Sequence, residues 1–428
     1  MAAEVFEPKG VEATRKAGGL FVISEPLPYL HSVALGFAYR IGSRDDPRGQ
    51  EGSAHLIEHM VFKGTSKMDA RRISIFAESC GAELNGFTDK EMTCFYCRFP
   101  AEETEPMVQL MREILGAPAF DEQELKKERQ VVMEEIRMSE EDPESCVVNL
   151  LLKAMYGDGS LGRPVVGTFA SIERTQSADL QRFYQTRYGT GNAVVVAVGD
   201  INHHRLAEML DNLDHREGQI LTRQKPAMET MRALCEQRKD ISQVYVCLAR
   251  PAFAYNDPRR YALSVLNTAL GGGVSSRLFQ RLREDEGLVY SIGSFVELYE
   301  DTGLLGVYFV AEAQKLRRCL AVLREEIASL RQKKLGEDEF ERARNMTKSA
   351  VLLGMESSTS RMMRLARNYL FLGRVTGIDE TVHAYNSLKM AEVVQLIDLL
   401  LDEDRFYAGV VGPLSEQEVL KAIDYDKS

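Results

Sequence analysis

The sequence lacks an excess of positive charge, because its 53 Lys and Arg face 64 Asp and Glu, a formal net charge of −11. Nucleic acids and anionic membranes bind mainly to basic surfaces, so neither is expected as the main partner. No stretch approaches the ~20 apolar residues that a membrane-spanning helix needs, and the start of the chain lacks the apolar core of a secretory signal. We therefore expect a cytoplasmic protein.

Cysteine is also scarce, with seven residues scattered along 428 positions. An odd number in a chain of this size indicates reduced thiols rather than a disulfide framework. Cys94 and Cys97 form a CxxC pair, but they lie in an alternating run and no second pair is near. They are interpreted as ordinary strand residues.

What is present is a globular composition, 44% hydrophobic and 27% charged, arranged as one unit used twice. A strand, an Asp-Pro turn and a helix are expected in 32–65 and again in 243–276. Late strands are expected at 193–198 and 406–411. We predict an α+β fold with two homologous domains related by internal duplication, 1–218 and 228–428, each a mostly antiparallel β-sheet packed with helices. The polar stretch 215–228 would link them.

The two copies differ at the polar positions that could form a site. Five polar residues of the first copy become apolar or small in the second: His55, Glu58, His59, Glu128 and Glu135 correspond to Leu266, Ala269, Leu270, Ala343 and Ala350. The fold therefore does not need these polar groups. Their presence together in one copy indicates a functional site.

The segment HLIEH predicts a metal site on a short helix, with Ser53 as its N-cap and Gly64 as its stop. His55 and His59 are four residues apart, so they project from one face and can converge on one zinc ion. Glu58 can take the proton of a water that attacks a carbonyl carbon, which makes it the candidate general base.

A catalytic zinc needs a third protein ligand, and a second helix can supply it. This helix is expected to start near Asp121 and stop at Pro143, with an apolar stripe through Leu125, Val132 and Ile136. Glu128 and Glu135 lie at the edge of the stripe, where a carboxylate is costly unless paired or metal-bound. Glu134 points to solvent. The alternative is that the edge of the stripe is exposed to solvent and that Glu128 and Glu135 are both solvated.

Five segments together resemble one peptidase family: GSRDDPRGQEGSAHLIEHMVFKGT, ELNGFTDKEMTCFY, ERQVVMEEI, LGRPVVGT and LREDEGLVY. They are similar to the pitrilysin, insulysin and mitochondrial processing peptidases, the inverzincin metallopeptidases with reversed HxxEH order. The resemblance covers nearly the whole chain and favours a short, single-unit member. It implies one Zn²⁺ per chain, with Glu135 as the third ligand and Glu128 as an acid that steadies the site.

The resemblance also implies roles that the residues alone do not suggest. Arg283 and Tyr290 would help bind substrate and stabilise the oxyanion, although alone they would be interpreted as a surface arginine and a half-buried tyrosine. The segment from Asn85 through Gly86 and Phe87 to Thr88 would be an edge strand to which a peptide substrate adds. A plain hairpin is the alternative. Gly86 stands where the family usually has alanine, which should soften the strand.

In the long fused relatives, two such units face each other around a closed chamber. The resemblance therefore implies that a short member forms a homodimer with composite sites. The expected function is a zinc endopeptidase for short or unfolded peptides. One alternative is a non-catalytic relative acting as a peptide-binding or assembly subunit, against which the retained metal residues argue. Another is a different metal hydrolase, such as a deamidase, against which the edge strand argues.

Overall fold

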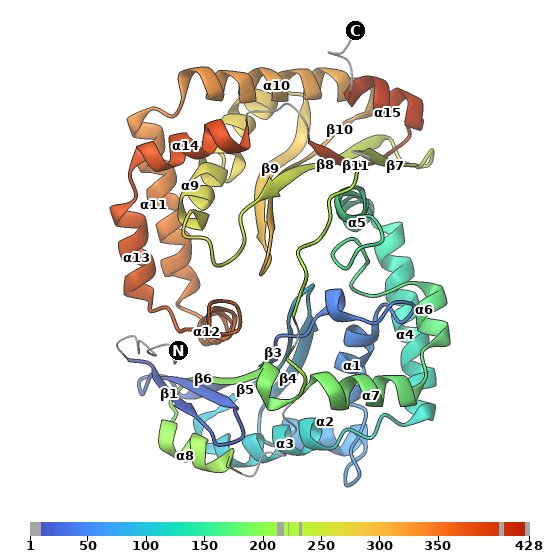
Figure 1. The fold of residues 1–428 in the computed structure, drawn as a ribbon, viewed down its shortest axis with the longest axis vertical. Helices are drawn as coiled ribbons and strands as arrows, with labels where there is room; N and C mark the ends of the chain where they lie inside the picture. Colours follow the sequence, from blue (N-terminus) through green and yellow to red (C-terminus); the bar gives the residue numbers. More distant parts are fainter. Residues whose placement is uncertain (1–9, 212–217, 221, 231–232, 402–405, 424–428) are drawn as a thin grey trace. The chain divides into compact units, whose positions relative to one another are not determined.

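The computed structural model describes residues 10–211, 218–220, 222–230, 233–401 and 406–423, which fall into two compact units (Figure 1). The first unit holds the described residues up to Arg137 together with Pro164–Arg223 and Leu352–Ile378. The second holds Met138–Arg163, Gln224–Val351 and the described residues from Asp379 onward.

Each unit is built on one sheet, and the two sheets share a strand order. The first has the order β1-β2-β6-β3-β5-β4 and the second β7-β11-β8-β10-β9. Among the described strands, only β2 with β6 and β7 with β11 pair in parallel, as equivalent neighbours in the two sheets. The order of the second sheet repeats that of the first without β1. The predicted α+β fold with a duplicated, mostly antiparallel architecture is therefore confirmed. The strand bounds are β1 Glu12–Arg15, β2 Phe21–Pro26, β3 Ser32–Tyr39, β4 Glu83–Thr88, β5 Thr93–Pro100, β6 Ala193–Gly199, β7 Ala233–Gln237, β8 Gln243–Ala252, β9 Val289–Leu298, β10 Gly303–Glu312 and β11 Tyr407–Gly412.

The helices divide between the units as follows. The first unit contains α1 Ser53–Val61, α2 Ala70–Ser79, α3 Thr104–Gly116, most of α4 Glu122–Glu141, α6 Phe169–Arg174, α7 Ser177–Arg187, α8 His203–Met209 and α12 Ser358–Leu372. The second contains α5 Pro143–Tyr156, α9 Arg260–Gly271, a π-helical turn at Phe279–Asp285, α10 Leu316–Lys333, most of α11 Glu337–Gly354, nearly all of α13 Ile378–Ser387, α14 Met390–Leu400 and α15 Glu416–Ile423. Among the described residues, no helix is both long and apolar enough to cross a membrane.

Alternation along the central strands gives each sheet two buried faces. In β3, Leu35 and Phe37 join the core beneath α1, α3 and α4, whereas Ala34 and Ala38 belong to the core of the opposite face. The same alternation places Cys94 and Cys97 of β5 on opposite faces, so the CxxC spacing makes no pair.

The second face of the first sheet is covered by α12, a helix from late in the chain (Figure 1). Its Met362 and Leu365 are fully or almost fully buried, which contributes about 1.5–3 kcal/mol each. The ring of Tyr369 stacks on Phe21 with the centroids 4.2 Å apart. In the second unit, α5 covers β11 and β8 in the equivalent way.

The two compact units therefore differ from the predicted domains 1–218 and 228–428, because each unit contains residues from both segments. The helix α5 lies in the earlier segment but packs in the second unit, and α12 lies in the later segment but packs in the first. Each sheet is apolar on both faces, so a second helix must cover the second face. For the first sheet this helix is α12, from the later segment, and for the second sheet it is α5, from the earlier segment. The expected linker 215–228 lies partly outside the described residues.

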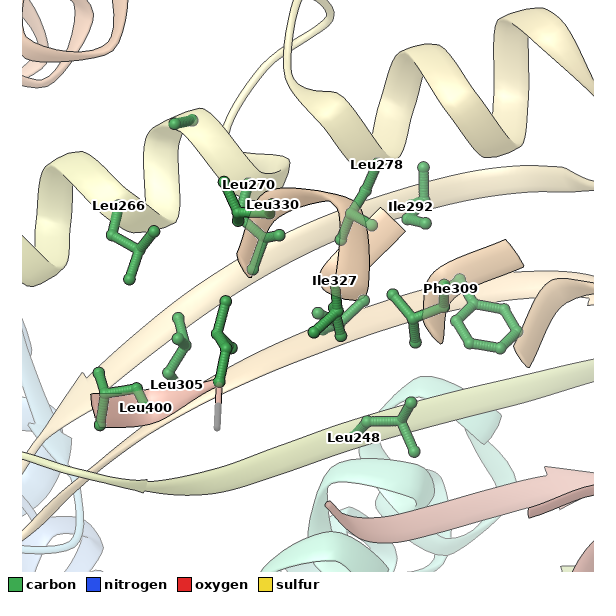
Figure 2. Close-up of a cluster of buried hydrophobic side chains, with 14 of the residues drawn as sticks. Leu248, Leu266, Leu270, Leu278, Ile292, Leu305, Phe309, Ile327, Leu330 and Leu400 are labelled. Carbon is green, nitrogen blue, oxygen red and sulfur yellow. The ribbon is translucent and has the colours of Figure 1, made fainter. Parts of the chain in front are cut away.

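The core of the second unit fills the positions that carry polar groups in the first. Figure 2 shows Leu266 and Leu270 on the side of α9 that turns toward Leu305 and other core side chains. Ala269 and Ala343 are buried in the same cluster. This copy thus packs as an ordinary hydrophobic core.

Candidate metal centre

Helix α1 is positioned by a carboxylate from the loop that precedes it. Asp46 accepts hydrogen bonds from the backbone N–H groups of Gly52 (2.7 Å) and Ala54 (2.8 Å). Gly52 adopts a φ of +90°, a conformation that suits glycine. The prediction that Ser53 is the N-cap is therefore wrong, because Ser53 is the first helical residue and Asp46 satisfies the helix start. The helix ends at Val61, before the predicted stop at Gly64.

The structure brings His55, His59 and Glu135 together. The two imidazole rings project from α1 with their centroids 4.7 Å apart. Each Nε2 atom lies 3.7 Å from Oε2 of Glu135 on α4. One donor atom from each of the three residues lies within 4.8 Å of the other two. Two nitrogens and one oxygen thus converge on one point.

Glu128 occupies the buried stripe of α4 itself, together with Leu125, Val132 and Ile136. The residue is only 5% exposed. Its Oε2 accepts a hydrogen bond from Nδ1 of His59 at 3.0 Å, and its Oε1 lies 2.8 Å from Nζ of Lys63. Burial opposes ionisation of Glu128, but these two partners outweigh it and hold the pKa of the carboxyl below its usual range. The alternative in which both acids are solvated is wrong for Glu128, whereas the side chain of Glu135 is 38% exposed.

The two histidines differ in their affinity for protons. Burial and the neighbouring His59 ring lower the pKa of His55 to about 4, so this ring is neutral at physiological pH. Burial also acts to lower the pKa of His59. The hydrogen bond with Glu128 and the charges of Glu135 and Glu58 outweigh that burial and raise it. A metal ion must therefore compete with a proton mainly at His59.

Glu58 lies on the same helix, with a carboxyl whose pKa is raised, chiefly by burial. The neighbouring Thr88 hydroxyl and the His59 ring oppose this shift, and the charge of Glu135 adds to it. Its Oε2 atom is buried and has no hydrogen-bond partner among the described residues. A raised pKa and an open acceptor are both suited to a group that takes and returns a proton.

The predicted edge strand is β4, which spans Glu83–Thr88 and lies at the end of its sheet, where it pairs with β5 in the described part of the chain. Gly86 faces the site so closely that a Cβ atom there would lie 3.0 Å from Cγ of Glu58 and 3.3 Å from Phe62. The lack of a side chain at Gly86 thus lets this backbone lie close to Glu58, and the softening of the strand remains a prediction. Phe87 stands between Gly86 and Thr88, half-buried.

Arg283 and Tyr290 belong to the second unit. Arg283 lies on the π-helical turn with its guanidinium carbon 4.9 Å from the centre of the Phe279 ring. Tyr290 is 75% exposed at the start of β9, so the expectation of a half-buried tyrosine is wrong. Their part in the site remains a prediction.

The donor set suits zinc, which binds imidazole nitrogen and carboxylate oxygen and keeps an open position in catalytic sites. His55, His59 and Glu135 would hold the ion. Oε2 of Glu58 is buried without a hydrogen-bond partner among the described residues, so a water molecule held by such an ion would supply the donor that this oxygen lacks. The residue types present thus fit a metal ion with a proton acceptor beside it.

Two residues that position the site were not identified from sequence, Asp46 and Lys63. Asp46 acts across a loop, which leaves only a general signal, an acidic residue shortly before a helix. Lys63 is four residues after His59 but lies beyond Val61, where α1 ends, so helical spacing gives no firm signal for its place.

Glu135→Gln is expected to lower zinc occupancy far more than Glu134→Gln. Glu135 faces both imidazoles, whereas Glu134 is 60% exposed and pairs with Arg137 at 2.6 Å. The two substitutions remove the same charge from adjacent positions, so the second is a matched control. Metal content after dialysis against limiting zinc measures the difference, and equal retention by both variants would refute the assignment.

The chain matches two protein-family profiles. Residues 21–169 match the family described as insulinase (peptidase family M16), and residues 175–347 match the peptidase M16 inactive domain. The second match includes Leu266, Ala269 and Leu270, which replace the polar residues of α1. The word inactive thus applies to the copy that lacks the three donors.

Known proteins resemble the chain over nearly its full length. It is 32% identical to an uncharacterized zinc protease of Streptomyces coelicolor, over 97% of this chain and 92% of that protein. It is 35% identical to an uncharacterized zinc protease of Mycobacterium leprae (96% and 94%) and 34% identical to the uncharacterized zinc protease YmxG of Bacillus subtilis (92% and 96%).

Solved structures share the fold. A peptidase M16 inactive domain from Pseudomonas fluorescens matches with a TM-score of 0.88 and 22% identity, over 95% of this chain and 98% of that chain. A protease from Helicobacter pylori matches with a TM-score of 0.84 and 21% identity, over 95% and 100%.

Proposed function

The chain belongs to the insulinase family of peptidases, M16, and we propose that it is a zinc-dependent endopeptidase of short or unfolded peptides. The observation that carries this proposal is the convergence of His55, His59 and Glu135 beside the half-buried Glu58, whose buried Oε2 has no partner among the described residues. The relatives named as zinc proteases support the identity of the metal.

A zinc ion bound by these donors would polarise the peptide carbonyl and make a water molecule easier to deprotonate. Glu58 accepts the proton of the attacking water at Oε2 and then donates it to the leaving amine nitrogen. In the metal-free site the pKa of Glu58 is raised, which makes its carboxylate a stronger base for the first of these transfers. Glu128 fixes the orientation of His59 through Nδ1 and so leaves Nε2 for the metal.

The substrate would add to the outer edge of β4 as a further strand. In the free protein the N–H of Gly86 donates to the side-chain oxygen of its neighbour Asn85 at 2.8 Å. A substrate carbonyl would replace that oxygen and so place the scissile bond beside Glu58. Recognition through backbone groups suits an endopeptidase that accepts many sequences.

Arg283 and Tyr290 would complete the site as donors to the oxyanion. We propose that they come from the second chain of a C₂ homodimer, which encloses a chamber that admits only flexible peptides. The high exposure of Tyr290 supports this, since a large aromatic side chain 75% exposed is available to a partner.

A peptide assay tests the proposed function. We expect the purified protein to cleave quenched unstructured peptides, to lose that activity on chelation and to regain it with zinc. A folded protein that contains the same cleavable sequence should resist cleavage. Hydrolysis that survives complete removal of metal would overturn the proposal.

A further inference from the structure

Behind the metal donors lies a second layer of polar groups that ends in a lysine. Nζ of Lys63 lies 2.8 Å from Oε1 of Glu128, and the other oxygen of Glu128 receives the N–H of His59 at 3.0 Å. Lys63, Glu128 and His59 therefore form a continuous chain of charge-assisted contacts that leads to Nε2 of His59, which faces Glu135.

Among the described residues, each oxygen of Glu128 has one donor, and this division matters because the carboxylate is buried. The side chain of Glu128 is 7% exposed, whereas that of Lys63 is 32% exposed. An ammonium group can donate but cannot accept a hydrogen bond. Lys63 therefore occupies Oε1 and leaves Oε2 for the N–H of His59. Without the lysine, Oε1 would be buried without its cation, and the carboxylate would be free to rotate toward water.

The backbone around Lys63 is itself held in place. The N–H of Lys63 donates to the carbonyl of Met60 at the end of α1, at 3.1 Å. The next carbonyl, that of Gly64, accepts from the N–H of Ala119 at 3.0 Å, three residues before α4 begins. The backbone at Lys63 is therefore bonded to the end of α1, and the backbone of the next residue is bonded to the segment that leads into α4.

We propose that Lys63 is a positioning residue of the metal centre, which holds Glu128 so that the imidazole of His59 presents Nε2 to the metal. This inference rests on the proposed function, because it concerns the same zinc site. Lys63 does not touch the metal or the substrate. It acts through Glu128, and its effect is on how tightly the metal is held.

The test is the zinc affinity of the full-length apoprotein, measured by competition with a chromophoric chelator. Substitution of a group that orients a ligand typically weakens metal binding by 10–100-fold, so we expect Lys63→Met to weaken it by about tenfold. Lys63→Arg should restore most of the affinity, since it keeps the charge and the donors. Lys67→Met is the control, because Lys67 also pairs with a glutamate, Glu113 at 2.7 Å, although this pair is more exposed and involves neither histidine.

A double variant tests whether Lys63 acts through Glu128. If it does, adding Lys63→Met to Glu128→Gln should weaken zinc binding little further, whereas full additivity would overturn the proposal. Equal zinc affinity of wild type and Lys63→Met would also overturn it. Should Lys63→Met fail to fold, Lys63→Arg and Lys63→Gln give the same comparison, with weaker binding expected for the glutamine.

The outcome separates this inference from the proposed function. If the wild-type protein binds zinc and Lys63→Met binds it equally well, only the role of Lys63 is wrong. If the wild-type protein binds no zinc, the proposed function fails and the inference fails with it.

Discussion

Glu58→Gln is expected to reduce peptide hydrolysis by about 10²–10⁴-fold while zinc stays bound. The amide keeps the size of the carboxylate but cannot accept the proton of the attacking water. Glu58 lies beside the three converging donors and is not one of them, so their arrangement should survive. The measurement is kcat for a quenched peptide together with the zinc content of the same sample.

The matched control for Glu58→Gln is Glu134→Gln, which makes the same chemical change on the exposed side of α4. Wild-type activity is expected for the control. Loss of zinc from Glu58→Gln would show that this residue holds the metal, and undiminished hydrolysis would show that another group is the base.

Mixing two inactive variants is expected to restore activity if the sites are shared between chains. Glu58→Gln removes the base, and Tyr290→Phe removes a proposed oxyanion donor, a loss that typically costs about 10²–10³-fold. In a dimer of one Glu58→Gln chain and one Tyr290→Phe chain, one site carries both defects and the other carries none. Random exchange of equal amounts should therefore return about a quarter of the wild-type activity.

Subunit exchange must be shown in the same experiment, for example by mass analysis of dimers formed from a tagged and an untagged variant. If mixed dimers form and activity stays at the level of the separate variants, each site is complete within one chain. A protein that remains monomeric under assay conditions and still cleaves peptides would lead to the same conclusion.

Helical periodicity limited the candidate donors to a few residues of the sequence, and the family resemblance then favoured Glu135 over Glu128 as the third ligand. A spacing of four residues places His55 and His59 on one face, and the phase of α4 favours Glu135 over Glu134. These are local relations, which hold wherever the helices pack. The apolar copy at Leu266 and Leu270 gave an independent reason, since its core shows that the fold needs no polar group there.

The parts that sequence could not predict depend on contacts between distant segments. The approach of Gly86 to Glu58 depends on how β4 lies against α1, which no local pattern specifies. The covering of the first sheet by α12 has no local signal either, because any amphipathic helix could fill that face. Asp46 takes the capping role expected of Ser53 because the loop folds back onto the start of the helix.

The most direct test of the central claim is a zinc titration of the apoprotein in which bound metal and peptide hydrolysis are measured on the same samples. The metal centre predicts that hydrolysis is absent without zinc, rises in proportion to bound zinc and levels off at about one ion per chain. Full hydrolysis in the metal-free protein, or saturation with zinc that brings no hydrolysis, would contradict the account.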